Sequence, residues 1–233
     1  MAAQDDARER EMRTLFNLTK PDEYGRGDID AVLELEGQAV PAALKGQKIP
    51  FELKSATGGR PNISTVRDFG LHYIEKWREL HWLFGVYLAE GGETKLQYCL
   101  YGSPQKMKPW FDQRAAYVGP DIALAECVPE LIDQEILTKV LGNGEDFGYE
   151  NAKLLMKNQL SRQGYRDAAD LKGERYSREA MLELLKERCR YVIERGSTLN
   201  NPHISPSYFN GWEKIDRNHA ARLRELVLEA LGA

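Results

Sequence analysis

Residues 81–88 form a nearly unbroken apolar run, and this run constrains the fold more than any other part of the chain. A short, continuous run rich in aromatic and branched residues predicts a strand that is buried on both faces. Gly91 and Gly92 then predict a turn, and Lys95–Tyr101 alternates like a partner strand. We therefore expect a sheet with a buried central strand.

Several other segments have the apolar spacing of amphipathic helices. One of them, residues 64–79, should begin at Ser64 or Thr65 as the N-cap, and another should run from an N-cap at Ser177 to a stop at Gly196. The full set of expected helices is 7–18, 64–79, 131–141, 149–163, 177–194 and 217–231. Strands interspersed with these helices predict the α/β (α+β) class: a mixed β-sheet core flanked by helices, with an added helical subdomain.

The composition excludes several classes of protein. No stretch of about 18 apolar residues exists, and the acidic N-terminus differs from a signal peptide, so we expect a cytoplasmic protein with no membrane association. The three cysteines, Cys99, Cys127 and Cys189, are far apart and predict neither a disulfide framework nor a zinc site. The net charge of −4 argues mildly against coating of a nucleic-acid backbone. However, residues 121–150 are net acidic and 151–195 net basic, which fits either one DNA-facing surface or two solvated helical faces.

Two short segments combine apolar residues with acidic ones. Asp28 and Asp30 lead into the apolar residues 31–33, and Glu52 and Lys54 are separated by a single leucine. Side chains two apart on a strand share a face, so Glu52 and Lys54 should project together while the residue between them points into the core. We expect Asp30 to be the principal acidic residue of the first segment, with Asp28 in reserve.

Two carboxylates and an ammonium suit the hydrolysis of a phosphodiester. The phosphodiester is already an anion, so attack by hydroxide needs a divalent cation that offsets charge and lowers the pKa of water. Mg²⁺ takes oxygen ligands and keeps several waters, so Asp30 and Glu52 would suffice. The glycine-rich segment 55–62 follows directly and should be a loop that meets the substrate. The pattern alone leaves an alternative open, because strands with one solvated face also carry such residues.

Three stretches follow the order of one known family. The first joins Asp30–Val32 to Phe51–Ser55, where the family has Asp-Ala-Val and then Glu-Leu-Lys-Ser. The second runs without a gap over Ser64–Tyr87, and the third is Asn200–Ile204 with Tyr208 following. With these stretches the chain resembles the PvuII-type restriction endonucleases of the PD-(D/E)xK nuclease superfamily. Their colinearity makes the resemblance more specific than Glu-x-Lys alone.

The resemblance implies roles for individual residues. Asp30 and Glu52 would bind Mg²⁺, and Lys54 would orient or help deprotonate the attacking water. Ser64, Arg67 and Asp68 would enter the major groove at the start of the predicted helix 64–79, and Asn201 would be the recognition asparagine. Beside these implied contacts, Arg60 and Asn62 in the loop expected to meet the substrate and His203 next to Asn201 are further candidates for DNA contact. Residues 1–120 would be the nuclease core with the catalytic sheet, 121–196 a helical insertion or subdomain, and 197–233 the DNA-recognition loop and C-terminal helix, packed with the core.

The chain also departs from the family. Asn201 would pair with adenine N6 and N7, but Arg67 and Asp68 replace the family's paired histidines and suit guanine and cytosine, so a different recognition sequence is expected. Trp77 replaces a tyrosine close to the scissile phosphate and cannot coordinate a metal through oxygen. Simpler explanations are that Arg67 and Asp68 form a surface ion pair and that residues 200–202 are only a turn.

We expect a homodimeric, Mg²⁺-dependent type II restriction endonuclease that hydrolyses double-stranded DNA at a short palindrome and leaves 5′-phosphate ends. A cognate DNA methyltransferase would be a functional, not a physical, partner. The family's N-terminal dimerisation region is shorter here, so dimerisation could have moved to residues 121–195. One alternative is a nicking or repair endonuclease of the same superfamily, and another is a catalytically inactive, sequence-specific DNA-binding module.

Overall fold

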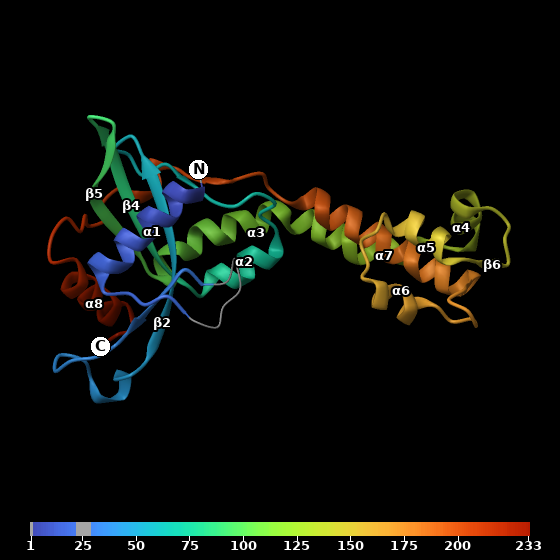
Figure 1. Ribbon diagram of the computed structural model, residues 1–233, viewed down its shortest axis with the longest axis horizontal. Coiled ribbons are helices and arrows are strands. Elements are labelled where there is room, and N and C mark those ends of the chain that lie inside the picture. The colour runs from blue at the N-terminus through green and yellow to red at the C-terminus, as the bar shows by residue number, and fades with distance from the viewer. Residues whose placement is uncertain (1, 22–28) are drawn as a thin grey trace. The chain divides into compact units, whose positions relative to one another are not determined.

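The computed structural model describes residues 2–21 and 29–233 (Figure 1). The chain divides into two compact units, each described by itself below. Unit 1 comprises residues 1–115 and 199–233, and unit 2 comprises residues 116–198. Within the described ranges, no helix has both the length and the apolar character needed to cross a bilayer.

Unit 1 is built on a curled, mixed four-stranded sheet, as expected for an α+β protein. Its strands, in the spatial order β1-β2-β4-β5, are β1 (Ala31–Glu34), β2 (Lys48–Thr57), β4 (His81–Glu90) and β5 (Glu93–Gly102). Strands β2 and β4 are parallel, and the other two pairs are antiparallel. The predicted buried strand is confirmed, because β4 is internal to the sheet and residues 81–87 are all buried.

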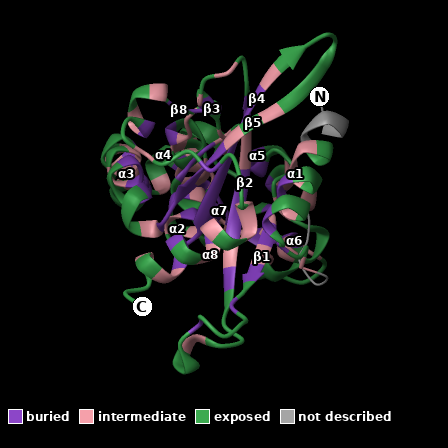
Figure 2. Cartoon of the chain, turned by 90° about the vertical axis from the view of Figure 1, so that its left-hand side faces the viewer, coloured by how far each residue is buried: buried purple, intermediate pink, exposed green. Residues whose placement is uncertain are grey.

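Alternation along the strands gives the sheet two different faces. One face contributes Leu33, Leu53 and Leu83 to an aliphatic core. The helices that complete this core are α1 (Ala2–Phe16) and α8 (His219–Ala230). The other face is aromatic and includes Trp82 and Phe84. It packs beside α2 (Leu71–Arg78) and the start of α3 (Pro104–Cys127), and in Figure 2 the buried strands lie between α1 and these two helices.

Two expectations for unit 1 are wrong, both because of tertiary pairing. The helix predicted for residues 64–79 begins only at Leu71, after Gly70 as the N-cap, so neither Ser64 nor Thr65 is a cap. Residues Ile63–Ser64 instead form the short strand β3, which pairs with β8 (His203–Ile204). The glycine-rich loop begins later than expected, because residues 55–57 continue β2 and pair with β4. The remaining unit 1 elements are the 3₁₀ helices η1 (Ala42–Leu44) and η3 (Pro206–Phe209).

Unit 2 has its own hydrophobic core and is largely helical. Its elements, besides the end of α3, are η2 (Pro129–Leu131), α4 (Gln134–Leu141), β6 (Asp146–Phe147), α5 (Tyr149–Met156), α6 (Arg162–Ala168), β7 (Tyr176–Ser177) and α7 (Arg178–Ser197). Ser177 caps α7 as expected, since its side chain accepts a hydrogen bond from the N–H of Ala180. The helix predicted for 149–163 is broken by left-handed backbone at Lys157 and Asn158, and α7 continues past Gly196.

Candidate active site

Asp30 lies directly before β1 and is fixed by the pairing of β1 with β2. Its backbone N–H donates to the carbonyl oxygen of Phe51 at 3.1 Å, and its Oδ2 accepts from the N–H of Leu53 at 2.9 Å. Arg13 of α1 donates to the Asp30 carbonyl oxygen at 3.4 Å. The carboxylate is therefore held at the edge of the sheet by backbone contacts while its side chain stays 25% exposed. Asp28, the reserve residue, lies outside the described residues.

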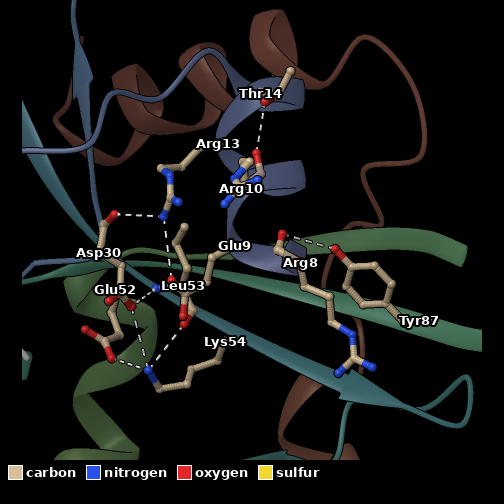
Figure 3. A network of polar contacts seen from close by, with 10 residues as sticks. All are labelled: Arg8, Glu9, Arg10, Arg13, Thr14, Asp30, Glu52, Leu53, Lys54 and Tyr87. Carbon is tan, nitrogen blue, oxygen red and sulfur yellow. Dashed lines mark hydrogen bonds and ion pairs between the residues drawn. The ribbon is translucent and has the colours of Figure 1, made fainter. Parts of the chain in front are cut away.

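Glu52 and Lys54 share one face of β2, as their spacing predicts. Leu53 between them is buried in the opposite, aliphatic core. The Lys54 Nζ donates to Oε1 of Glu52 and, at 3.2 Å, to the carbonyl oxygen of Leu53, and it lies 3.7 Å from Oδ2 of Asp30 (Figure 3). The sheet thus brings together the three predicted catalytic side chains, with the carboxylates of Asp30 and Glu52 next to the ammonium of Lys54. Glu52 and Lys54 lie in the middle of β2, and Asp30 lies just before β1.

The charges in this cluster are strongly perturbed by burial. Glu52 is only 4% exposed, and loss of solvation raises its pKa to about 7, with Lys54 opposing the rise and Asp30 adding to it. Burial alone would lower the pKa of Lys54, but the Glu52 and Asp30 carboxylates outweigh it, and the net pKa is raised. Lys54 is therefore an ammonium at neutral pH, whereas Glu52 exchanges its proton close to pH 7.

Two residues of α1 that the sequence did not single out also belong to the cluster. Glu9 and Arg13 form an i,i+4 ion pair of 3.6 Å beside Asp30 (Figure 3). Burial raises the pKa of Glu9, and the charge of Asp30 adds to this rise. The i,i+4 spacing of opposite charges was visible in the sequence. That spacing is common on solvated helices, and nothing in it indicated which strand the pair faces.

The oxygen atoms around Lys54 fit a hard divalent cation. Asp30, Glu52 and the Leu53 carbonyl all present oxygens toward the same ammonium group, and such oxygens are the ligands that Mg²⁺ prefers. Residues 2–21 and 29–233 contain no group of three or more His, Cys, Asp or Glu side chains that could hold a metal. In proteins Mg²⁺ is usually bound through one or two carboxylates and keeps several waters.

A second cluster joins the two segments predicted to contact DNA. Ser64 pairs with His203 and Ile63 with Ile204 in the β3–β8 ribbon. The ribbon is extended by Thr65, whose Oγ1 donates at 2.7 Å to the Pro202 carbonyl oxygen, 137 residues away in sequence. A further bridge connects residues 69 and 199. The loop of residues 58–62 leads from β2, which carries Glu52 and Lys54, to this ribbon, and β3 also contacts β2.

The predicted DNA-contacting side chains lie on or beside the ribbon and face solvent. All are exposed except Asp68, which is half-buried: Arg60, Asn62, Ser64, Arg67, Asn201 and His203. The prediction that Ser64, Arg67 and Asp68 lie at the start of a helix is wrong. They lie before α2, and Asp68 has a left-handed backbone (φ 61°), as does Asn201 (φ 42°). Among residues other than glycine, Asn and Asp tolerate this conformation best.

The indole ring of Trp77 in α2 packs against the cluster of Asp30, Glu52 and Lys54. Its ring centroid lies 5.2 Å from the Lys54 Nζ, and the residue is 2% exposed.

No known protein-family model matches this chain, and a search of curated proteins finds no relative.

Proposed function

We propose that this protein is a Mg²⁺-dependent endonuclease of the PD-(D/E)xK superfamily, with a restriction-endonuclease-like fold. The observation that carries this proposal is the convergence of Asp30, Glu52 and Lys54 around one ammonium on a mixed sheet. An arbitrary strand with a solvated face would leave these groups in water. Here Glu52 is buried beside Lys54, and a buried carboxylate with a strongly shifted pKa is typical of functional sites.

The residues divide the chemistry of hydrolysis among themselves. A bound Mg²⁺ would offset the charge of the phosphate and lower the pKa of a coordinated water. Asp30 and Glu52 would hold the ion, with Asp30 oriented by its hydrogen bond from Leu53. Lys54 would orient the attacking water and stabilise negative charge on the phosphate as it develops. The surrounding burial strengthens each of these electrostatic interactions.

The β3–β8 ribbon would read DNA in the major groove, whose width admits a two-stranded β-ribbon as well as a helix. Arg67 would pair with guanine O6 and N7, Asn201 with adenine N6 and N7, and Asp68 with the N4 amino group of cytosine. Arg60 and Asn62 in the preceding loop, together with Ser64 and His203 on the ribbon, would contribute further contacts. The hydrogen bonding between β3 and β8 supports this assignment, because it joins both predicted segments in one surface next to the catalytic strand.

We further propose a type II restriction endonuclease that acts as a homodimer on a short palindrome. Twofold symmetry in the protein would match twofold symmetry in the site, and each protomer would cut one strand to leave a 5′-phosphate. A cognate methyltransferase would protect the host DNA as a separate enzyme.

Digestion of a phage genome and a supercoiled plasmid with Mg²⁺, followed by sequencing of fragment ends, tests the function. We expect discrete double-strand ends that share one sequence, and loss of cutting in Glu52→Ala and Lys54→Ala with DNA binding retained. Glu90→Ala, at the exposed end of β4, is the control and should cut normally. Open circles alone would indicate a nicking enzyme, and sequence-specific binding without metal-stimulated cutting would indicate a DNA-binding module. Full activity in both site variants would remove the assigned site.

A further inference from the structure

Lys54 contacts an aromatic ring as well as carboxylates. Its Nζ lies 5.2 Å from the centroid of the Trp77 ring, within the range of a cation–π interaction. Trp77 is supplied by α2, so this contact links the catalytic strand to a helix on the aromatic face of the sheet. The ammonium is thus bounded by Glu52, Asp30 and an indole ring.

The Trp77 ring is fixed by other aromatic residues. Its centroid lies 5.0 Å from that of Tyr73, 5.7 Å from that of Phe69 and 5.3 Å from that of Trp82, the last at an interplanar angle of 89°. The Trp82 Nε1–H also donates to the Trp77 carbonyl oxygen at 3.3 Å. With the ring held by these neighbours, the position of the indole does not depend on Lys54.

Packing alone does not explain a tryptophan here. The Trp77 Nε1 is buried, and it finds no hydrogen-bond partner among the residues that the structure describes. A buried N–H without an acceptor destabilises the fold, and phenylalanine or leucine would fill apolar space without that loss. Tryptophan does, however, offer the strongest π face to a cation. The residue type therefore suits contact with an ammonium better than simple core filling.

Lys54 needs such a contact because its side chain is long and flexible. The attraction of Glu52 and Asp30 holds the ammonium. A divalent cation bound to the same carboxylates would compete for that attraction and repel the ammonium. The neutral ring of Trp77 would keep its attraction for Lys54 under these conditions.

We propose that Trp77 is the positioning residue for Lys54, holding its ammonium in place while the carboxylates bind metal. The inference rests on the proposed nuclease function, but its first test does not. In protein labelled with ¹³C-lysine, the ε-methylene protons of Lys54 should resonate upfield of those of the exposed Lys139, owing to the ring current of Trp77. Lys54→Arg assigns the signal. Trp77→Leu should abolish the upfield shift, and Trp77→Phe should retain part of it.

The second test is the rate of single-turnover DNA cleavage in Mg²⁺, with DNA affinity measured separately in Ca²⁺. Trp77→Leu should slow cleavage by about 10-fold, and Trp77→Phe by no more than about 3-fold, with affinity unchanged in both. Trp110→Leu is the matched control. Trp110 is also buried, and it packs against Phe69 in the same aromatic cluster. The tryptophan ring next to the Lys54 ammonium is that of Trp77. Thermal unfolding of each variant reports the loss of packing.

The outcomes separate the inference from the function on which it rests. If the wild-type protein cuts no DNA, the nuclease proposal fails, while the NMR shift still decides whether Trp77 holds Lys54. An ordinary Lys54 shift in the wild-type protein would overturn the inference, as would equal slowing by Trp77→Leu and Trp110→Leu at equal loss of stability. If Trp77→Leu does not fold, Trp77→Phe tests the inference, and its Lys54 chemical shift should lie between that of the wild type and that of an exposed lysine. Its cleavage rate should be no more than about 3-fold below that of the wild type. A shift identical to wild type in that variant would also overturn the inference.

Discussion

The Nζ of Lys54 in β2 lies 3.7 Å from Oδ2 of Asp30, which precedes β1. The same Oδ2 accepts a hydrogen bond from the N–H of Leu53, the residue before Lys54. One oxygen of Asp30 is therefore fixed both by the backbone of β2 and by the charge of a β2 side chain. This double contact explains how a residue outside the strands is held beside Glu52 and Lys54 of β2.

Asp30→Asn tests the carboxylate without removing its support. An asparagine can still accept the Leu53 hydrogen bond through its amide oxygen, so the fold should survive. The negative charge is lost, so the variant should bind Mg²⁺ more weakly and should no longer orient Lys54. We expect DNA cleavage to fall by at least about 100-fold, the scale on which a lost electrostatic contact in a catalytic site acts. Gel assays of cleavage and of DNA binding measure both effects, and near-normal cutting by this variant would exclude Asp30 as a ligand.

Metal binding should depend on pH near neutrality. The pKa of Glu52 is raised to about 7, so protons should compete with a metal ion below this pH. Mg²⁺ affinity should therefore fall as the pH is lowered from 8 to 6, and binding near pH 7 should release protons. Calorimetry in buffers of different ionisation enthalpy measures that release. An affinity that is flat across this range, without proton release, would contradict the assignment of Glu52.

Lys54→Met should destabilise the metal-free protein in a pH-dependent way. Without the ammonium, Glu52 is a buried carboxylate without its charge partner, and breaking such a pair costs about 3 kcal/mol. The folded-state pKa of Glu52 is raised above its unfolded value, so its stabilising contribution is complete at low pH and is lost as the pH rises through the folded pKa. The decrease in the free energy of unfolding caused by Lys54→Met should therefore be small at pH 5, where Glu52 is protonated, and large at pH 8, where it is charged.

Urea unfolding at both pH values measures this difference. Lys139→Met is the control, because Lys139 pairs with Glu135 at 2.8 Å on an exposed helix face. It should change the free energy of unfolding by less than about 1 kcal/mol at either pH. Equal effects of the two substitutions would show that the Glu52–Lys54 pair is not a buried one.

Asn201→Gly tests base reading at the ribbon. Glycine adopts the left-handed backbone of Asn201 (φ 42°) without strain, so the substitution removes the amide while leaving the turn intact. If Asn201 pairs with adenine, specific DNA binding should weaken by about 1–3 kcal/mol, and discrimination should relax at one base pair. Asn218→Gly is the matched control, since Asn218 is also left-handed (φ 49°) but lies at the start of α8. Binding to randomised sites, followed by sequencing, measures both; unchanged specificity in Asn201→Gly would reject the base contact.

The sequence by itself determined the features that depend on local periodicity. Burial of β4 follows from its unbroken apolar run, and its hairpin with β5 from the two glycines and the alternating strand after them. The shared face of Glu52 and Lys54 follows from the two-residue repeat of a strand. The N-cap of α7 at Ser177 follows from the local satisfaction of a helix N–H group. In each case the residues that fix the structure are close neighbours in the chain.

Only the tertiary structure decided where distant segments meet. Residues 64–69 carry helical spacing, yet Thr65 bonds to Pro202 and Ile63 pairs with Ile204, which makes this segment part of a ribbon. Both isoleucines are fully buried there, and burial of apolar surface outweighs the small differences in local propensity. The place of Glu9 beside Lys54 was unpredictable for the same reason, because a spacing pattern shows which face of a helix is buried but not which strand it packs against. For Trp77, spacing was equally silent, and only the family resemblance put this residue near the predicted site.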